Sequence, residues 1–220
     1  MRIGKQNVRV ILFVNRNKII LVGHSEGCIL STIANTINPV AGMVLIAGAG
    51  TNLREPLKYQ NAQILKEIIN LKGLKGILLR LALNEKKLQK QQDDLYNTMI
   101  NSKRDTVKLK GKKMPAKWFR EHFKYTDEEI LKALSGANCP ILAVTGDKDV
   151  QANPEDLNTV GKLEKDNIKT VVIKDMDHML KEFTGEKTVL NIMKQYKGEA
   201  SKPMHPELEY VLEQWLNQQL

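Results

Sequence analysis

The sequence predicts a protein of the α/β class, with a mostly parallel sheet, flanking helices and an inserted helical block. Short apolar runs alternate with amphipathic stretches near the start of the chain, and the same alternation returns after residue 135. Between the two regions the apolar residues follow helical spacing. The 220 residues are 42% hydrophobic and 27% charged. Because these fractions are typical of globular proteins, they exclude a wholly disordered or fibrous chain.

The first alternating region predicts a parallel crossover unit. Lys18–Gly23 is a short apolar run that ends in glycine, as expected of a buried strand. Apolar residues at helical spacing follow over Cys28–Ile37, and Asn38-Pro39 is expected to end that helix. Val40–Ala47 is a second apolar run. A strand, a helix and a strand within about 30 residues form a crossover between parallel neighbours.

The middle of the chain predicts helices. From Pro56 to about Glu121, apolar residues recur every three or four positions, and Gly73 and Gly76 are expected to separate this region into shorter helices. The basic stretch Lys108–Pro115 is expected to be a solvated loop. We therefore predict that this helical block interrupts an α/β sheet domain.

The strand and helix alternation then resumes. Thr126–Glu129 has the pattern of a capping box that opens a helix running to Leu134. The later elements are expected to be a strand over Pro140–Thr145, a helix over Asn153–Leu163, a strand over Lys169–Ile173 and an amphipathic helix over Pro206–Leu220.

The charge is concentrated in the predicted helical block. Residues 54–125 hold 18 basic and 7 acidic residues, a net +11, whereas residues 1–53 carry +4 and residues 126–220 carry −6. Aromatic residues make up 5% of the chain, and it has no recognisable nucleic-acid motif, so we expect no nucleic-acid partner. A basic surface on this block could still favour anionic substrates or a membrane surface.

A glycine-flanked serine lies where the first predicted strand meets the first helix. Gly23-His24-Ser25-Glu26-Gly27 has the form G-x-S-x-G, in which a sharp turn exposes the serine hydroxyl above the edge of a sheet. The tight turn is expected to require both glycines. Ser25 is thus the candidate nucleophile. The backbone amide of Glu26, at the start of the helix, is the candidate donor to an oxyanion.

A serine nucleophile needs a general base, and the sequence offers four histidines. His178 follows the Lys169–Ile173 strand, where a catalytic side chain would emerge at the carboxyl edge of a parallel sheet, so we choose it. His24 lies inside the sharp turn and is expected to be structural. His122, in the predicted helical block, and His205, before the last helix, are expected at the surface.

The carboxylate that orients the histidine is expected after the Pro140–Thr145 strand. Asp149 is our choice because it lies further along that loop and can reach His178. Asp147 is the fallback, with a turn-forming role as the alternative. Asp175 and Asp177 flank His178 as substitutes. The order serine, aspartate, histidine is the order found in α/β-hydrolases.

Four segments resemble bacterial α/β-hydrolases, above all the serine esterase and aminopeptidase-like hydrolases: Ile19–Gly27, Val44–Gly50, Ile141–Gln151 and Asp177–Lys181. The resemblance runs from about Lys18 to the C-terminus. It implies Ser25 as nucleophile, Asp149 as acid and His178 as base. It also implies a helical cap over residues 51–134, inserted into a hydrolase core made of residues 1–50 and 135–220. Cys28 occupies a position where that family often has a small residue such as glycine.

Only 24 residues precede Ser25, whereas the family has several strands before its nucleophile. At most one element, around Val8–Val14, fits upstream, so the chain resembles an α/β-hydrolase without its N-terminal strands. The strand that bears Ser25 would then have an unpaired edge open to self-association. The oxyanion hole would have the Glu26 amide without a second donor, a loss that costs on the order of 100- to 1,000-fold in rate.

The resemblance implies a serine hydrolase that cleaves carboxylic esters of small molecules through an acyl-enzyme. A serine peptidase of the aminopeptidase type is the enzymatic alternative, and a catalytically impaired fragment or binding module is the non-enzymatic one. The scattered His and Cys residues indicate no metal site, and no cofactor is expected. The chain shows no signal peptide or membrane span, so we expect a cytoplasmic protein without stable membrane insertion.

Overall fold

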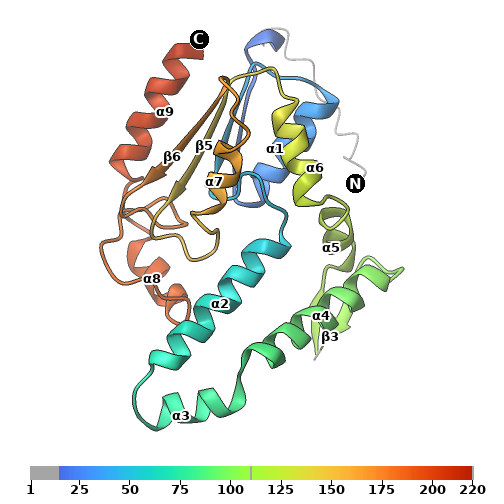
Figure 1. Cartoon of the computed structure of the whole chain (residues 1–220), viewed down its shortest axis with the longest axis vertical. Helices are drawn as coiled ribbons and strands as arrows, with labels where there is room; N and C mark the ends of the chain where they lie inside the picture. Colours follow the sequence, from blue (N-terminus) through green and yellow to red (C-terminus); the bar gives the residue numbers. More distant parts are fainter. Residues whose placement is uncertain (1–14, 110, 220) are drawn as a thin grey trace.

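A parallel sheet forms the centre of the described part of the chain. The computed structural model describes residues 15–109 and 111–219. The sheet has four strands in the order β1–β2–β5–β6, and all neighbours are parallel. Helices cover both faces (Figure 1), as expected for the α/β class. The strands are β1 (Ile20–His24), β2 (Gly42–Ile46), β5 (Ile141–Gly146) and β6 (Ile168–Ile173).

The predicted first crossover unit is confirmed. Helix α1 (Glu26–Ile37) follows β1 and returns the chain to β2, so that Gly42 pairs with Ile20. The helix ends at Asn38, which has an extended backbone (φ −136°, ψ 98°). A residue before proline avoids the helical region because of a clash with the proline ring, so Pro39 explains this boundary.

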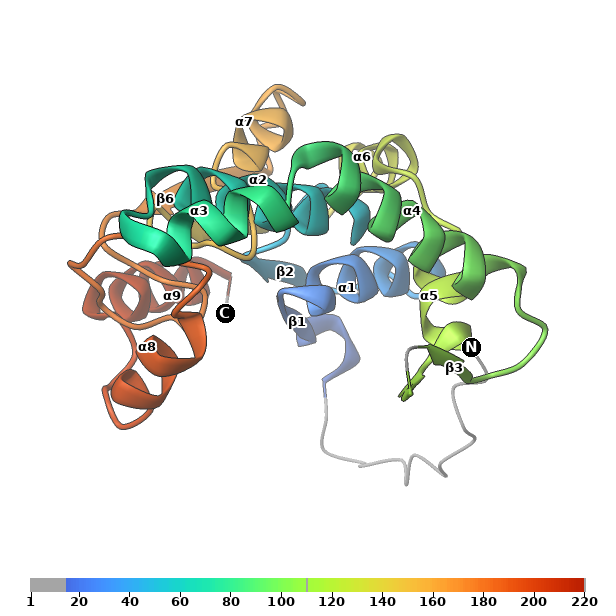
Figure 2. The same ribbon diagram turned by 90° about the horizontal axis from the view of Figure 1, so that it is seen from below.

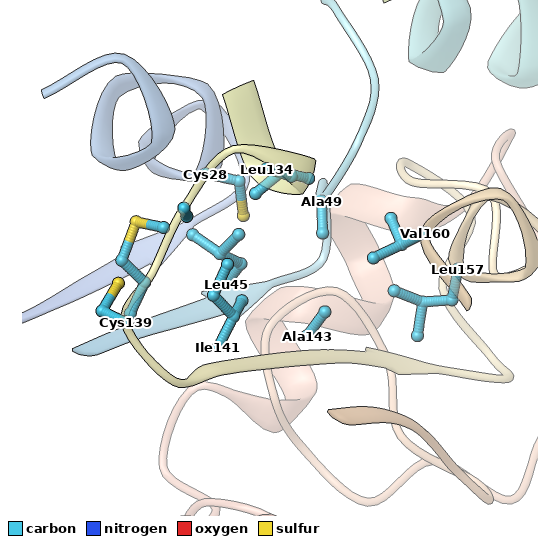
Figure 3. Packing of buried hydrophobic residues seen from close by; sticks show 11 residues of the cluster. Cys28, Leu45, Ala49, Leu134, Cys139, Ile141, Ala143, Leu157 and Val160 are labelled. Atoms are coloured by element: carbon cyan, nitrogen blue, oxygen red, sulfur yellow. The ribbon is translucent and has the colours of Figure 1, made fainter. Parts of the chain in front are cut away.

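The core lies on both faces of β2 and β5, whose residues are all buried. Alternate side chains of a strand point to opposite faces, so each strand contributes to two apolar layers. One layer, shown in Figure 3, combines strand residues such as Leu45 with Leu134 of α6 (Asp127–Ser135) and Val160 of α7 (Asp156–Gly161). The opposite layer includes Leu208 and Trp215 of α9 (Pro206–Gln219).

The segment between β2 and β5 is mostly helical, as predicted. Gly73 begins α3, but Gly76 lies inside that helix and does not interrupt it. The predicted capping box at α6 is confirmed, because the Thr126 hydroxyl accepts from the Glu129 amide (3.2 Å) and the Glu129 carboxylate accepts from the Thr126 amide (2.8 Å). Before α6 come α2 (Arg54–Asn70), α3 (Gly73–Ala82), α4 (Glu85–Asn101) and α5 (Ala116–His122).

The described residues of Lys108–Pro115 are mostly exposed, as predicted, but the prediction that they form a loop is wrong. Strands β3 (Val107–Leu109) and β4 (Lys112–Met114) form an antiparallel hairpin instead. Gly111 has φ +81°, a left-handed conformation that glycine adopts readily and that tight hairpin turns require. Lys108, Lys112 and Lys113 are exposed. Apolar residues of both strands pack on a small cluster made of Tyr96, Met99, Ala116 and Phe119. The run of charged residues therefore predicted the exposure of this stretch but not its two strands.

The C-terminal half contains the predicted strand β6 and the helices α7 and α9, with α7 shorter than expected. Helix α8 (Ile192–Glu199) was not predicted. Its contacts with the site loops are polar: Gln195 donates to the Asp177 carboxylate (3.1 Å), and Gln151 donates to the Tyr196 hydroxyl (2.8 Å). A short helix that docks through hydrogen bonds leaves little apolar periodicity in the sequence.

Among the described strands, β1 pairs with β2 alone, and Val22 in β1 is 63% exposed. The element expected around Val8–Val14 lies outside the described residues. Self-association through this edge therefore stays a proposal. Within residues 15–109 and 111–219, no helix combines the length and apolar character needed to cross a membrane.

Candidate active site

Ser25 occupies the sharp turn between β1 and α1. Its backbone has φ 55° and ψ −119°, and its amide donates to the Ile46 carbonyl of the neighbouring strand (2.8 Å). A Cβ on Gly23 would lie 2.3 Å from the Gly27 carbonyl oxygen, so only glycine fits there. A Cβ on Gly27 would meet nothing within 4 Å. The expectation that both glycines are sterically required is thus right for Gly23 and wrong for Gly27.

Asp149 lies at the carboxyl end of β5 and is fully buried. Its Oδ1 accepts from the amides of Gln151 (2.7 Å) and Ala152 (2.9 Å), which hold the carboxylate in one orientation. The other oxygen, Oδ2, is 2.8 Å from His178 Nδ1. Tyr59 of α2 donates to the Asp149 carbonyl (3.2 Å). Since a carboxylate accepts hydrogen bonds, His178 Nδ1 donates, which leaves Nε2 able to accept a proton.

His178 is held by the loop that follows β6. The carbonyl of Asp177 accepts from the Leu180 amide (3.1 Å), and the Asp177 amide donates to the Lys181 carbonyl (3.0 Å). His24 Nε2 lies 2.9 Å from the His178 carbonyl oxygen, and the two rings are 4.9 Å apart. Desolvation and the neighbouring His178 lower the pKa of His24. Neutral His24 thus donates to the loop, consistent with its expected structural role.

The remaining candidate carboxylates have other partners. Asp147 Oδ1 accepts from the Asp175 amide (2.6 Å), the turn-forming role named as its alternative. Asp175 lies 3.6 Å from the Lys148 ammonium group. Asp177 accepts from the Lys181 amide (3.0 Å) and from Gln195. Of the carboxylates considered, Asp149 is therefore the one that contacts the His178 ring.

Ser25 and His178 line the same small cavity, of about 120 Å³. One wall comes from α1 and the loop after β2, and includes Ile29 and Gly48. The opposite wall comes from the segment between β2 and β5, with Leu53, Pro56, Leu57 and Trp118. These walls are mainly apolar, and no aspartate or glutamate of the described chain is among the lining residues. The cavity is suited to a small uncharged group beside the serine.

Glu26 is connected to helix α5 through its side chain. Its Oε1 accepts from Trp118 Nε1 (2.8 Å) and lies 2.7 Å from His122 Nε2. His122 Nδ1 in turn lies 2.8 Å from the Trp118 carbonyl oxygen. Because the backbone amide of Glu26 is the candidate oxyanion donor, α5 contacts the residue that carries this donor. Sequence reasoning missed this link, which joins residues 92 positions apart.

The expectations for two histidines are wrong. His122 and His205, expected at the surface, are 7% and 6% exposed. His122 is buried because it joins Trp118 at Glu26. His205 accepts from the Glu207 amide through Nδ1 (3.2 Å) at the start of α9, and its own amide donates to the Leu180 carbonyl (2.8 Å). Each histidine also has a contact that is distant in the sequence, His122 through its ring to Glu26 and His205 through its backbone amide to Leu180.

Cys28 is an apolar core residue rather than a reactive thiol. It is 1% exposed, and its thiol donates to the Ile46 carbonyl (3.2 Å). Burial raises the pKa of this thiol to about 12, so it stays protonated. Within the described residues, no group of three or more His, Cys, Asp or Glu side chains could hold a metal ion.

Comparisons with known proteins agree on the fold. No family model and no curated sequence matches the chain. The monoacylglycerol lipase of Paleococcus ferrophilus superposes with a TM-score of 0.50 at 16% identity, over 93% of this chain and 70% of the lipase. A thermophilic esterase from Thermogutta terrifontis gives 0.44 at 18% identity, over 92% of this chain and 66% of the esterase. The lipase superposition shows that the chain has the α/β-hydrolase fold. The chain spans about two thirds of the length of these two solved structures.

Proposed function

We propose that this chain, which has the α/β-hydrolase fold, is a serine hydrolase that cleaves carboxylic esters of small molecules. The proposal is carried by one observation: His178 Nδ1 donates to the buried Asp149 carboxylate, in a cavity that His178 shares with Ser25. A serine, a histidine and an aspartate in these relations are the parts of a nucleophilic acyl-transfer site.

In the first half of the reaction, Ser25 Oγ attacks the acyl carbon of the ester. His178 Nε2 takes the hydroxyl proton, and Asp149 stabilises the resulting imidazolium. The Glu26 amide donates to the oxyanion of the tetrahedral intermediate, assisted by its position at the start of α1. The intermediate collapses as His178 returns the proton to the leaving alcohol, and the acyl group remains on Ser25.

In the second half, water replaces the alcohol. His178 Nε2 takes a proton from the water as its oxygen attacks the acyl carbon of the acyl-enzyme. The second tetrahedral intermediate breaks the bond to Ser25 Oγ, which regains its proton from His178. The products are a carboxylic acid and the free enzyme, so one water is consumed for each ester cleaved.

The cavity favours an ester with a short acyl chain. Its volume of about 120 Å³ leaves little room beside Ser25, and its walls are largely apolar. A peptidase that binds a free amino group would need an anionic anchor, whereas the lining contains no carboxylate among the described residues. In the proposed enzyme, residues 51–134 act as the cap that supplies Leu57 and Trp118 to the cavity.

The proposal is tested by turnover of p-nitrophenyl acetate, butyrate and octanoate with the full chain. We expect activity that falls as the acyl chain lengthens, and loss of at least about 1,000-fold in kcat for Ser25→Ala. Ser201→Ala changes an exposed serine and is the matched control, which should keep wild-type kcat. Turnover that survives Ser25→Ala would contradict the proposed nucleophile.

Covalent labelling tests the nucleophile without turnover. An alkyl fluorophosphonate should add one phosphonyl group to the wild type and to Ser201→Ala, and none to Ser25→Ala, as read by intact mass. Absence of both labelling and turnover in the folded protein would favour the alternative of an impaired hydrolase fragment that acts as a binding module. Cleavage of amino-acid p-nitroanilides in preference to esters would favour the peptidase alternative.

A further inference from the structure

Helix α3 exposes a continuous apolar side to solvent. Leu74, Ile77, Leu78 and Leu81 are 72%, 49%, 58% and 72% exposed. Their spacing of three and four residues brings them to one side of the helix. Ile69, 66% exposed near the end of α2, adds to the apolar surface close in sequence. We refer to these five residues as the α3 surface.

The α3 surface lies far from the sheet. In Figure 1, α3 is at the end of the segment opposite the sheet, and Figure 2 also shows it on the outside of the molecule. Single exposed leucines are ordinary, but neighbouring exposed apolar side chains on one helix mark a docking site, because each loses unfavourable contact with water when it is covered.

Basic residues are frequent in and next to α3 in the sequence. Residues 72–90 contain six lysines and arginines and one acidic residue, Glu85. Arg80 donates to the carbonyls of Ile68, Ile69 and Leu71, and Lys87 donates to those of Leu81 and Ala82, so both cations also stabilise helix ends. Lys72, Lys86 and Lys90 are exposed. The partner that covers α3 must therefore tolerate, or prefer, a dense positive charge.

Charge decides between two kinds of partner. A second copy of this chain would bring an equally basic helix against the first, and like charges would repel. An anionic phospholipid surface offers negative headgroups for the lysines and acyl chains for the leucines. With ten residues, α3 is too short to cross a bilayer but long enough to lie in its interface.

We propose that α3 docks this protein reversibly on anionic phospholipid membranes. The helix lies in the plane of the interface, with the α3 surface among the acyl chains and the lysines at the headgroups. Helix α2 separates this helix from Pro56 and Leu57 in the cavity wall, which lie at its other end. The inference goes beyond the proposed hydrolase activity and does not depend on it.

The test measures binding of the full chain to vesicles by co-sedimentation. One set contains phosphatidylcholine with about 30% phosphatidylglycerol, and the other contains phosphatidylcholine alone. We expect binding to the anionic set, loss of binding on the neutral set and a strong decrease between about 0.05 and 0.5 M NaCl. Binding that is equal on both vesicle sets would overturn the proposal.

Paired variants test the α3 surface itself. Leu78→Ser with Leu81→Ser, and separately Lys86→Glu with Lys90→Glu, should each lower the bound fraction at least about fivefold. Ile37→Ser with Met193→Ser removes apolar side chains that are 69% and 67% exposed elsewhere, and Lys194→Glu with Lys197→Glu reverses two exposed charges on α8. Both control pairs should bind as the wild type does.

Two further measurements separate the possible failures. Unchanged far-UV circular dichroism and melting temperature exclude unfolding of the variants, and unchanged turnover of p-nitrophenyl butyrate separates membrane docking from ester cleavage. Wild-type binding by both α3 variants would overturn the proposal. The proposal would also be overturned if the protein did not bind vesicles but formed a concentration-dependent dimer that Leu78→Ser with Leu81→Ser abolished. A second copy would then cover α3.

Discussion

Strands β2 and β5 bury every residue, whereas α3, in the segment that joins them, leaves Leu74 and Leu81 each 72% exposed. The strands are fixed by parallel ladders on both sides and by apolar layers on both faces. The α4–α5 part of the segment has its own small cluster around Met99 and Phe119. More independent contacts thus hold each residue of β2 and β5 than hold the exposed residues of α3.

This difference matches the proposed division of work. In the proposed reaction, proton transfer from Ser25 to His178, which Asp149 orients, requires fixed distances, and the loops after β5 and β6 inherit them from the rigid sheet. A surface that meets a substrate or a membrane needs exposed apolar groups, which the segment can offer without disturbing the sheet. Trp118 is where the regions meet, since it lines the cavity and donates to Glu26.

The largest effect is expected at the rigid region, from Asp149→Asn. The asparagine amide would donate towards His178 Nδ1, so the ring would carry its proton on Nε2 and could not accept one from Ser25. We expect kcat for p-nitrophenyl butyrate to fall about 10,000-fold. Asp147→Asn, which keeps its acceptor for the Asp175 amide, is the matched control and should change kcat little. Equal losses in both variants would argue against Asp149 as the orienting carboxylate.

The second prediction compares the stability of the two regions directly. Leu45→Ala removes a fully buried side chain from β2 and should lower the free energy of unfolding by about 2–5 kcal/mol. Leu81→Ala makes the same chemical change on α3 and should alter it by less than about 0.5 kcal/mol. Urea unfolding followed by circular dichroism measures both. A similar loss for Leu81→Ala would mean that α3 is covered in solution.

The third prediction concerns the contact between the regions. Trp118→Phe keeps an aromatic wall but removes the Nε1 donor to Glu26, so the residue that carries the oxyanion amide is held less firmly. We expect kcat to fall about tenfold with little change in KM. Glu26→Gln retains an acceptor for Trp118 and should lose less. A Trp118→Phe enzyme with higher KM and unchanged kcat would make Trp118 a substrate contact alone.

The smallest effect is expected at Asp156 of α7, close to the segment between β2 and β5. Burial, followed by the charges of Asp127, Glu55 and Glu155, raises the pKa of Asp156 to about 6 from 3.8. The folded state therefore holds more protons than the unfolded state between these values, and Asp156 costs stability as pH rises from about 4 to about 6. At pH 7.5, Asp156→Asn should raise the free energy of unfolding by less than about 1 kcal/mol, seen as a higher melting temperature. Near pH 3.5 the melting temperature should be unchanged. An equal shift at both pH values would contradict this origin.

Local patterns succeeded where neighbouring residues make the structure. The crossover from β1 to β2 followed from two apolar runs and an amphipathic stretch, and the Thr126 capping box involves residues three apart. The prediction at the hairpin β3–β4 failed for the opposite reason. Its lysines read as a solvated loop, while its stability comes from packing on Tyr96 and Phe119, which the local sequence does not contain.

The sequence by itself determined the α/β class, the sharp turn at Ser25 and the loops that bear Asp149 and His178, because strand periodicity and glycine sterics act over a few residues. Only the tertiary structure decided that His178 contacts Asp149 among several nearby carboxylates, that His122 is buried, and that Trp118 reaches Glu26. Those contacts join residues 29, 96 and 92 positions apart. They depend on how distant parts of the chain pack together, and not on the conformational preference of any short stretch of sequence.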